Sequence, residues 1–399
     1  MIFVILIVLV AAIRLWVLSC SSAKAPLVLK PPLNIASAWK RPDNSRHDAP
    51  WFYPWCHLTP QDPIPHGLIY IKIDKASSST LTGINLRLAH RIGTRMAAAM
   101  GKDTTAIATT CAHTYQHFHA WPRLSKGHDP FHSSSVLWTF LRDPYNRAMA
   151  EYFHFLVSRR GYGVTYTLLH SFLESTKNFQ TKYAMVPSAS SLQYDSSFTN
   201  TNLTKILLDV VENRPSSTMG FLDLFVMKRY DFIGLVERMD ESLAVMKLLW
   251  NLTIADLIVL SAKQSGSYDD GRYQNRCVRI TKPNEYFSRG PKEKKLFNRI
   301  QDYVQKGFRH NNLDYPLYSE INARLDVTIQ MLGRDKVERT IQDIRYLRRK
   351  AETECRNEAV FPCSSNGTNQ WELSAKNCYW YDSGCGYQCV DRVVDQMAA

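Results

Sequence analysis

The sequence predicts an α/β fold in which a central, mainly parallel sheet is covered by helices. Short apolar runs at 68–73, 136–141 and 230–237 are typical of strands that are buried on both faces, and 106–111 is a fourth candidate. Segments with apolar residues at helical spacing follow these runs, and this alternation along the chain is typical of parallel sheets. With 399 residues and 45% hydrophobic content, the chain is long enough to bury one large core.

The expected helices are defined by the spacing of their apolar residues. After the first strand, this pattern is carried by Leu81, Ile84, Leu88, Ile92 and Met96. After the strand at 136–141, it is carried by Met149, Tyr152, Phe153 and Leu156. We expect Asp240 to cap a helix that carries Leu243, Met246 and Trp250, and two long helices at 292–308 and 317–350.

The chain begins with a segment unlike the rest. Residues 1–20 are apolar except for Arg14, and a membrane-spanning helix needs about 20 such residues. Basic residues follow this segment rather than precede it, which by the positive-inside rule favours the orientation opposite to a luminal chain. A transmembrane signal anchor and a cleaved signal peptide therefore both remain open. Residues 21–66 contain nine of the 18 prolines and are expected to form a stem, the later part of which packs on the domain.

The cysteines indicate an oxidising compartment. Of nine cysteines, eight lie outside the apolar segment, and five of these crowd the tail at 351–399. An even number behind a secretory-type segment predicts disulfide bonds, whereas the paired spacing of a zinc site is missing. Three N-x-T triplets, at Asn202, Asn251 and Asn366, agree with a luminal glycoprotein.

The charge balance favours anionic partners. Lysine and arginine (49) exceed aspartate and glutamate (36), which gives a formal net charge of +13. No nucleic-acid-binding motif occurs, so we expect an anionic cofactor or substrate rather than DNA or RNA.

A lysine and a run of hydroxyl residues come where the first strand turns into a helix. Ligands of such sheets bind beyond the carboxyl ends of the strands, and a helix N-terminus attracts anions. The pattern is not the G-x-x-x-x-G-K-[ST] loop, because the lysine precedes the turn. By itself the segment is more typical of an ordinary polar loop. Its members are Lys75, Ala76, Ser77, Ser78, Ser79 and Thr80.

A second cationic position ends the strand at 136–141. Arg142 closes that strand, and Pro144 opens a helix at a position where its missing N–H is not needed. Arg142 is therefore expected beside the first loop, where it would hold a second anionic group.

These two segments resemble the two cofactor-binding motifs of the Golgi carbohydrate sulfotransferases. "KASSSTL" is similar to their 5′-phosphosulfate loop (K-T-A-S-S-T-L), and "LRDPYNRAMAEY" to their 3′-phosphate motif (R-D-P-x-x-R-x-x-S-x-Y). "FIGLVERMDESL" is similar to the strand–helix step that follows, so the likeness spans roughly 67–350. The 2-O- and galactose 3-O-sulfotransferase branches are the most similar.

The resemblance implies a P-loop-like fold and 3′-phosphoadenylyl sulfate (PAPS) as sulfuryl donor, without a metal. It implies that Lys75 acts on the leaving phosphate, that Ser77–Thr80 hold the 5′-phosphate and that Arg142 holds the 3′-phosphate. Two departures matter: the hydroxyl of the loop is shifted by Ala76 and Ser77, and Ala150 replaces the serine that helps to hold the 3′-phosphate. Losing such a hydrogen bond costs about 1.5–3 kcal/mol.

A general base is expected on the loop after the second strand, which offers His113, His117 and His119. The resemblance implies a catalytic histidine here, and its distance from the R-D-P motif fits His117 best, with His113 as the alternative. A metal site made by these histidines is the weaker interpretation. Glu237 is expected to be a structural acid rather than a base. Arg159 and Arg160 are candidates for contact with the cofactor or an acidic acceptor. Residues 345–350 are expected to form a solvated helix face.

We therefore expect a luminal sulfotransferase that modifies a glycan hydroxyl and is attached to the Golgi membrane by its N-terminal segment, or secreted if that segment is cleaved. A nucleotide phosphotransferase and a non-enzymatic glycan- or nucleotide-binding relative are the alternatives, the latter because of Ala150. The sequence does not specify the acceptor sugar.

Overall fold

The computed structural model describes residues 39, 68–99, 112–116, 136–185, 218–260, 267–269, 277–359, 361, 363–370, 378–380, 383–385 and 387–396. The expected membrane segment at 1–20 and the stem at 21–66, except for Trp39, lie outside this part of the chain. Within the described residues no helix is long and apolar enough to cross a membrane.

The centre of the fold is a four-stranded sheet with the order β2-β1-β3-β4. Its strands are β1 (Leu68–Lys72), β2 (Ala112–Gln116), β3 (Val136–Leu141) and β4 (Phe232–Leu235). All three strand pairs are parallel, which confirms the expected α/β class. After β1 the chain forms β2 on one side of β1, and it then crosses over to form β3 on the other side of β1. The order therefore reverses between β1 and β3, and ligands of such sheets bind at the carboxyl end of that position.

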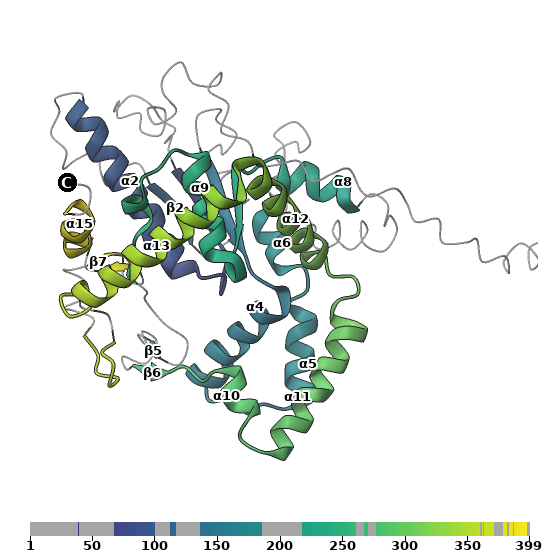
Figure 1. Cartoon of the computed structure of the whole chain (residues 1–399). Coiled ribbons are helices and arrows are strands. Elements are labelled where there is room, and N and C mark those ends of the chain that lie inside the picture. The colour runs from purple at the N-terminus through teal and green to yellow at the C-terminus, as the bar shows by residue number, and fades with distance from the viewer. Residues whose placement is uncertain are drawn as a thin grey trace, which may run out of the picture. The chain divides into compact units, whose positions relative to one another are not determined.

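Helices make up most of the remaining described residues (Figure 1). The α-helices of the first half are α2 (Ser78–Ala99), α4 (Pro144–Glu151), α5 (Tyr166–Ser175), α6 (Phe179–Ala184), α8 (Thr218–Leu222) and α9 (Met239–Leu249). Those of the second half are α10 (Pro283–Phe287), α11 (Pro291–Tyr303), α12 (Asp314–Leu332), α13 (Arg334–Cys355) and α15 (Tyr387–Asp395). Two antiparallel pairs are β5 (Tyr268–Asp269) with β6 (Val278–Arg279), and β7 (Cys378–Trp380) with β8 (Ser383–Cys385).

Several short segments next to these α-helices are wound as π- or 3₁₀-helices. They are the π-helical η2 (Tyr152–Arg159), η4 (Asp223–Met227) and η7 (Val304–Phe308), and the 3₁₀-helical η5 (Val236–Arg238) and η6 (Ile254–Leu257).

The sheet core is packed around large aromatic side chains. The rings of Tyr70 on β1 and Trp138 on β3 lie 4.5 Å apart, and the Trp138 indole N–H donates to Asn85 of α2. Gly234 of β4 lets Phe140 approach so closely that a Cβ there would lie 2.4 Å from its ring. This contact explains why β4 contains a glycine although glycine weakens strands.

A second apolar cluster lies among the helices and is separate from the sheet core. It contains Met149, Tyr152 and Phe153 of the α4–η2 helix, with side chains from α5, α10, α11 and η7 around them. In Figure 1 these helices lie together in the lower part of the molecule, below the sheet. We call this part the helical lobe, defined by α4–η2, α5, α10, α11 and η7.

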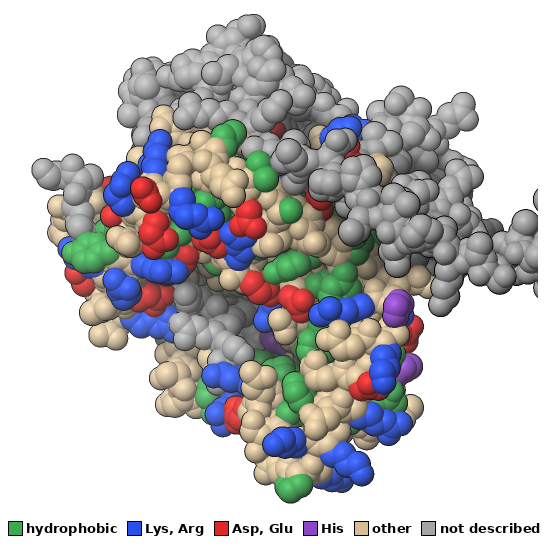
Figure 2. All heavy atoms as spheres, turned by 45° about the vertical axis from the view of Figure 1, so that its right-hand side comes forward, with side chains coloured by type: hydrophobic (Ala, Val, Ile, Leu, Met, Phe, Trp, Pro, Cys, Tyr) green, Lys and Arg blue, Asp and Glu red, His purple; other side chains and the backbone are tan. Residues whose placement is uncertain are grey.

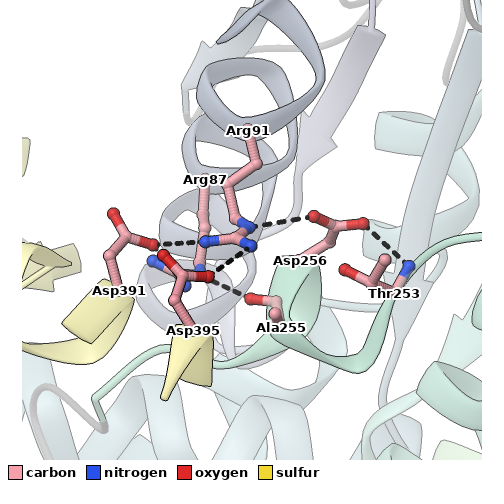
Figure 3. A network of polar contacts seen from close by, with 7 residues as sticks. All are labelled: Arg87, Arg91, Thr253, Ala255, Asp256, Asp391 and Asp395. Carbon is pink, nitrogen blue, oxygen red and sulfur yellow. Dashed lines mark hydrogen bonds and ion pairs between the residues drawn. The ribbon is translucent and has the colours of Figure 1, made fainter. Parts of the chain in front are cut away.

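An ionic network fastens the C-terminal helix to α2 (Figure 3). Asp391 of α15 accepts from Arg87 (2.8 Å) and from Arg91 (2.6 Å), and Arg91 also reaches Asp256 of η6 (3.1 Å) and Asp395 (3.1 Å). The disulfide between Cys355 and Cys389 ties the same helix α15 to the end of α13. The tail is therefore joined to the helix that begins at the lysine- and serine-rich loop.

The expectation of disulfides is confirmed for four cysteines. Besides Cys355–Cys389, a bond joins Cys277, next to β6, to Cys363. The two N-x-T asparagines in the described residues, Asn251 and Asn366, are exposed, as glycosylation requires. Trp39 of the expected stem is buried in the sheet core, where its backbone N–H donates to Thr328.

Four expectations about the elements need correction. The strand expected at 106–111 lies outside the described residues, but 112–116 forms a strand, so that His113 lies within a strand, opposite Ile69, rather than after it. The fourth strand covers only 232–235 of the expected 230–237. The helix expected at 317–350 is two helices, because Gly333 adopts φ 89° between α12 and α13. Asp240 lies inside the first turn of α9, where it accepts from Arg345 and Arg348 instead of capping the helix.

Candidate functional site

A cavity of about 780 Å³ opens where the strand order reverses. One wall is formed by the loop after β1, the start of α2 and the end of β3, and we call it the sheet wall. The opposite wall is formed by α4–η2, β5–β6, α10 and α11, and we call it the helical wall. The residues predicted from sequence that line this cavity are Lys75, Ser77, Ser78, Ser79, Thr80, Arg142 and Ala150.

The predicted loop after β1 makes a tight turn with unusual backbone angles. Lys75 and Ser77 adopt φ angles of 61° and 55°, a left-handed conformation that is uncommon for residues other than glycine. The N–H of Ala76 between them donates to Ile73, and its methyl group is buried in the sheet core. Ala76 therefore supports the loop from behind instead of lining the cavity.

The start of α2 offers free donors to the cavity. Leu81 is the first residue whose N–H bonds to the carbonyl four residues earlier, that of Ser77 (3.1 Å). The N–H groups of Ser78, Ser79 and Thr80 precede this bond and have no acceptor within the helix. Together with the left-handed turn before them, they form a concave row of donors of the kind that binds phosphate and sulfate.

Lys75 crosses from the sheet wall toward the helical wall. Its Nζ lies 4.6 Å from the centroid of the Phe155 ring, on η2, in a cation–π contact. Its backbone carbonyl accepts a hydrogen bond of 3.0 Å from Nη1 of Arg142. The two predicted loops, which are 67 residues apart, are therefore in direct contact.

Hydrogen bonds to the backbone of Arg142 hold this residue in place. Gln180, fully buried on α6, accepts from the Arg142 N–H (2.8 Å) and donates to its carbonyl (2.7 Å). Burial lowers the pKa of the Arg142 guanidinium, although the carboxylates of Glu237 and Asp143 oppose this shift. An arginine starts from so high a pKa that this side chain still remains a cation at neutral pH.

Glu237 braces the end of β3. It accepts from the backbone N–H of Asp143 (3.1 Å) and from the Tyr318 hydroxyl (3.0 Å), and lies 3.8 Å from Nε of Arg142. A carboxylate with these partners supports the cation next to it, in agreement with the expected structural role.

The α4–η2 helix begins at the second predicted motif and forms part of the helical wall. Asp143 caps it by accepting from the N–H of Asn146 (2.8 Å). Arg147 turns inward, fully buried, with Nη1 2.6 Å from Glu151 and its guanidinium 3.8 Å from the Phe179 ring. Ala150 presents its methyl group to the cavity, and the helix then widens into the π-helical η2, a distortion often found at functional sites.

His154 is a cavity residue that the sequence analysis missed. It lies on η2, is only 8% exposed and lines the cavity, with its ring 4.7 Å from that of Phe155. Its position four residues after Ala150, on the same face of a helix, is the sequence signal that would have found it. Of the predicted histidines, His117 and His119 lie outside the described residues, and His113 is described only as a position in β2.

The remaining helical wall was also not foreseen. The cavity is also lined by Thr281, Lys282 and Asn284 near the start of α10, and by Phe297 and Gln301 of α11. Gln301 donates to the Tyr145 hydroxyl (3.0 Å), which joins α11 to α4. Among the residues that the structure describes, no group of three or more His, Cys, Asp or Glu side chains could hold a metal ion.

The site therefore combines a row of backbone donors and hydroxyls, a lysine and an arginine at one end of a large cavity. This arrangement suits a ligand with two anionic groups, with room beyond them for a second molecule. Comparison of the chain with family models, with curated proteins and with solved structures found no match.

Proposed function

We propose that the protein transfers a sulfuryl group from PAPS to a hydroxyl of a glycan. The observation that carries this proposal is the meeting of the two motif-like loops, through the Arg142–Lys75 bond, at the point where the sheet order reverses. A P-loop-like fold, in which a helix N-terminus holds the 5′-phosphate, is part of the proposal.

In this proposal the donors of 77–80 bind the 5′-phosphosulfate and Arg142 binds the 3′-phosphate. The acceptor oxygen attacks sulfur while the bond between sulfur and the bridging phosphate oxygen breaks, and the electron pair of that bond stays on the leaving 3′-phosphoadenosine 5′-phosphate. Lys75 stabilises the developing charge, and a base takes the acceptor proton. For the base we keep His117, with His113 as alternative, and add His154 because it lines the cavity.

The luminal Golgi location and the N-terminal membrane anchor remain part of the proposal. The two disulfides and the exposed N-x-T asparagines support an oxidising, glycosylating compartment.

Calorimetric titration with 3′-phosphoadenosine 5′-phosphate tests the proposal directly. We expect binding by the wild-type chain, a loss of at least about tenfold in affinity for Arg142→Ala, since a charge-assisted contact contributes about 1.5–3 kcal/mol, and no change for Arg339→Ala. Arg339 is an exposed arginine of α13 and serves as the control.

The absence of binding by the wild-type chain would refute the proposal. Binding without transfer of labelled sulfate to any glycan of a broad panel would instead favour a non-enzymatic relative, for which Ala150 is the supporting observation.

A further inference from the structure

A buried aspartate, Asp314, lies behind the arginine of the site. It is the first residue of α12, which lies beside α6 in Figure 1, and is only 2% exposed. Its Oδ1 accepts from the backbone N–H and the hydroxyl of Thr181, both at 2.8 Å, and its Oδ2 accepts from the backbone N–H of Gln180 (3.1 Å). Because the side chain of Gln180 holds both backbone groups of Arg142, Asp314 is joined to the site through α6.

These contacts give α6 a cap that its preceding residue does not supply. Gln180 and Thr181 are the second and third residues of α6, so their N–H groups have no acceptor within the helix. In most helices the side chain of the residue before the first turn accepts from such groups. Asn178 holds that position here, but it adopts φ 60° and its side chain accepts from the N–H of Leu313 instead. Asp314 therefore replaces the local cap and fixes the start of α6 to the start of α12.

A carboxylate in this position depends on its partners. Figure 2 shows other acidic side chains, in red, on the surface, where water solvates them, whereas the buried Asp314 lacks this solvation. Burial raises the pKa of the Asp314 carboxyl, and the hydrogen bonds from Thr181 and Gln180 and the positive charge of Arg147 oppose this shift. Arg147 is itself fully buried on α4. The groups that keep Asp314 charged thus come from α4 and α6, the two helices that adjoin Arg142.

The direction of an arginine side chain is set by the backbone that carries it. Gln180 fixes both the N–H and the carbonyl of Arg142, so a shift of α6 would turn the guanidinium away from its place in the cavity. We propose that Asp314 is a positioning residue, which through α6 and Gln180 holds the Arg142 guanidinium where it meets the 3′-phosphate of the donor. This inference rests on the proposed function. Asp314 is not one of the described residues that line the cavity, so it acts without touching the ligand.

The test replaces Asp314 with Asn in the full chain, which keeps the shape of the side chain but turns an acceptor into a donor beside α6. Asp231→Asn is the matched control, because Asp231 accepts from a backbone N–H of β3, that of Leu137 (2.8 Å), at the end of the strand opposite to Arg142. Thr181→Val, which removes a single hydrogen bond to Asp314, is a milder variant in case Asp314→Asn does not fold. Calorimetry measures affinities for 3′-phosphoadenosine 5′-phosphate and for adenosine 5′-phosphate, which lacks the 3′-phosphate.

We expect Asp314→Asn to lower affinity for 3′-phosphoadenosine 5′-phosphate about tenfold, the effect of one lost hydrogen bond to a charged group, and Thr181→Val to lower it about threefold. Affinity for adenosine 5′-phosphate should stay unchanged, as should both affinities in Asp231→Asn. In an Arg142→Ala background, Asp314→Asn should cause no further loss, because the contact through which Asp314 acts is already missing.

Unchanged affinity in Asp314→Asn, equal losses for the two nucleotides, or a further loss in the Arg142→Ala background would overturn the inference and leave the proposed function intact. Failure of the wild type to bind 3′-phosphoadenosine 5′-phosphate would instead refute the proposed function, and this inference with it. Hydrogen exchange tests the structural link without a nucleotide. The Arg142 N–H should exchange faster in Asp314→Asn than in Asp231→Asn, and equal exchange in the two variants would overturn the inference.

Discussion

The two walls of the cavity are built by different physical means. The sheet wall is fixed by hydrogen bonds between distant segments: Gln180 holds both backbone groups of Arg142, and Arg142 holds the carbonyl of Lys75. The helical wall is held mainly by packing of aromatic side chains, with Phe153 surrounded by Tyr152, Tyr286 and Phe287. Hydrogen bonds fix positions within tenths of an ångström, whereas apolar packing tolerates exchange of side chains. This difference agrees with the proposed function, in which the sheet wall binds the anionic groups of one fixed donor and the helical wall binds a variable acceptor.

The largest expected effect concerns the origin of the base. If the base is His117, predicted on the loop after the second strand, His117→Ala should lower kcat by about 10²–10⁴-fold, the usual contribution of a general base. Affinity for 3′-phosphoadenosine 5′-phosphate should be unchanged. Stopped sulfate-transfer assays with His117→Ala, His113→Ala and His154→Gln decide between these three candidates. Full activity of His117→Ala together with loss in His154→Gln would move the base to the helical wall.

The next prediction concerns stability. Phe140 is fully buried in the sheet core and Phe153 almost fully buried in the helical lobe, so replacing either by Ala should lower the free energy of unfolding by about 3–5 kcal/mol. We expect hydrogen exchange to rise throughout the strands in Phe140→Ala, but chiefly in α5, α10 and α11 in Phe153→Ala. The same exchange pattern in both variants would show that the two regions unfold as one unit.

A smaller effect is expected at the polar supports of the walls. Gln180→Ala leaves the backbone N–H and carbonyl of Arg142 without their partner, at a cost of about 1–3 kcal/mol. It should weaken binding of 3′-phosphoadenosine 5′-phosphate about tenfold. Gln301→Ala, which removes a hydrogen bond within the helical wall, should leave that affinity unchanged and raise KM for the acceptor. The reverse outcome would invalidate the division of roles between the walls.

The smallest expected effect is a gain. Ala150 lines the cavity at the position where the resembling motif has a serine, and Ala150→Ser adds a hydroxyl there. A new hydrogen bond to a charged phosphate contributes about 1.5 kcal/mol at the lower end of the usual range, so affinity should rise about tenfold. Ala150→Val, which adds volume without a donor, is the control in the same titration. An equal gain in both variants would attribute the effect to packing.

The sheet wall was largely predictable because its signals are local. A buried strand followed by Lys75 and the hydroxyl run, and a second followed by Arg142 and Pro144, mark strand ends within a few residues of sequence. The reversal of strand order between β1 and β3 then brings those ends together. The inward position of Ala76 was not predictable, since it depends on the left-handed turns at Lys75 and Ser77.

The helical wall was not predictable because its parts meet only through tertiary packing. Nothing near Lys282 or Gln301 in the sequence signals that α10 and α11 fold back against α4. His154 was hidden for a similar reason, since its apolar neighbours predicted only a core-facing helix. The break at Gly333 was missed because periodicity alone does not register a positive φ angle.

The network around Asp391 has a consequence for the order of events during biosynthesis. Asp391 lies 304 residues beyond Arg87, so the helix that starts at Ser78 leaves the ribosome long before its partner does. Until α15 is made and Cys389 has found Cys355, the buried guanidinium of Arg87 lacks its carboxylate. The helix that follows the Lys75 loop is therefore fully supported only after the C-terminal helix has been made and its disulfide has formed.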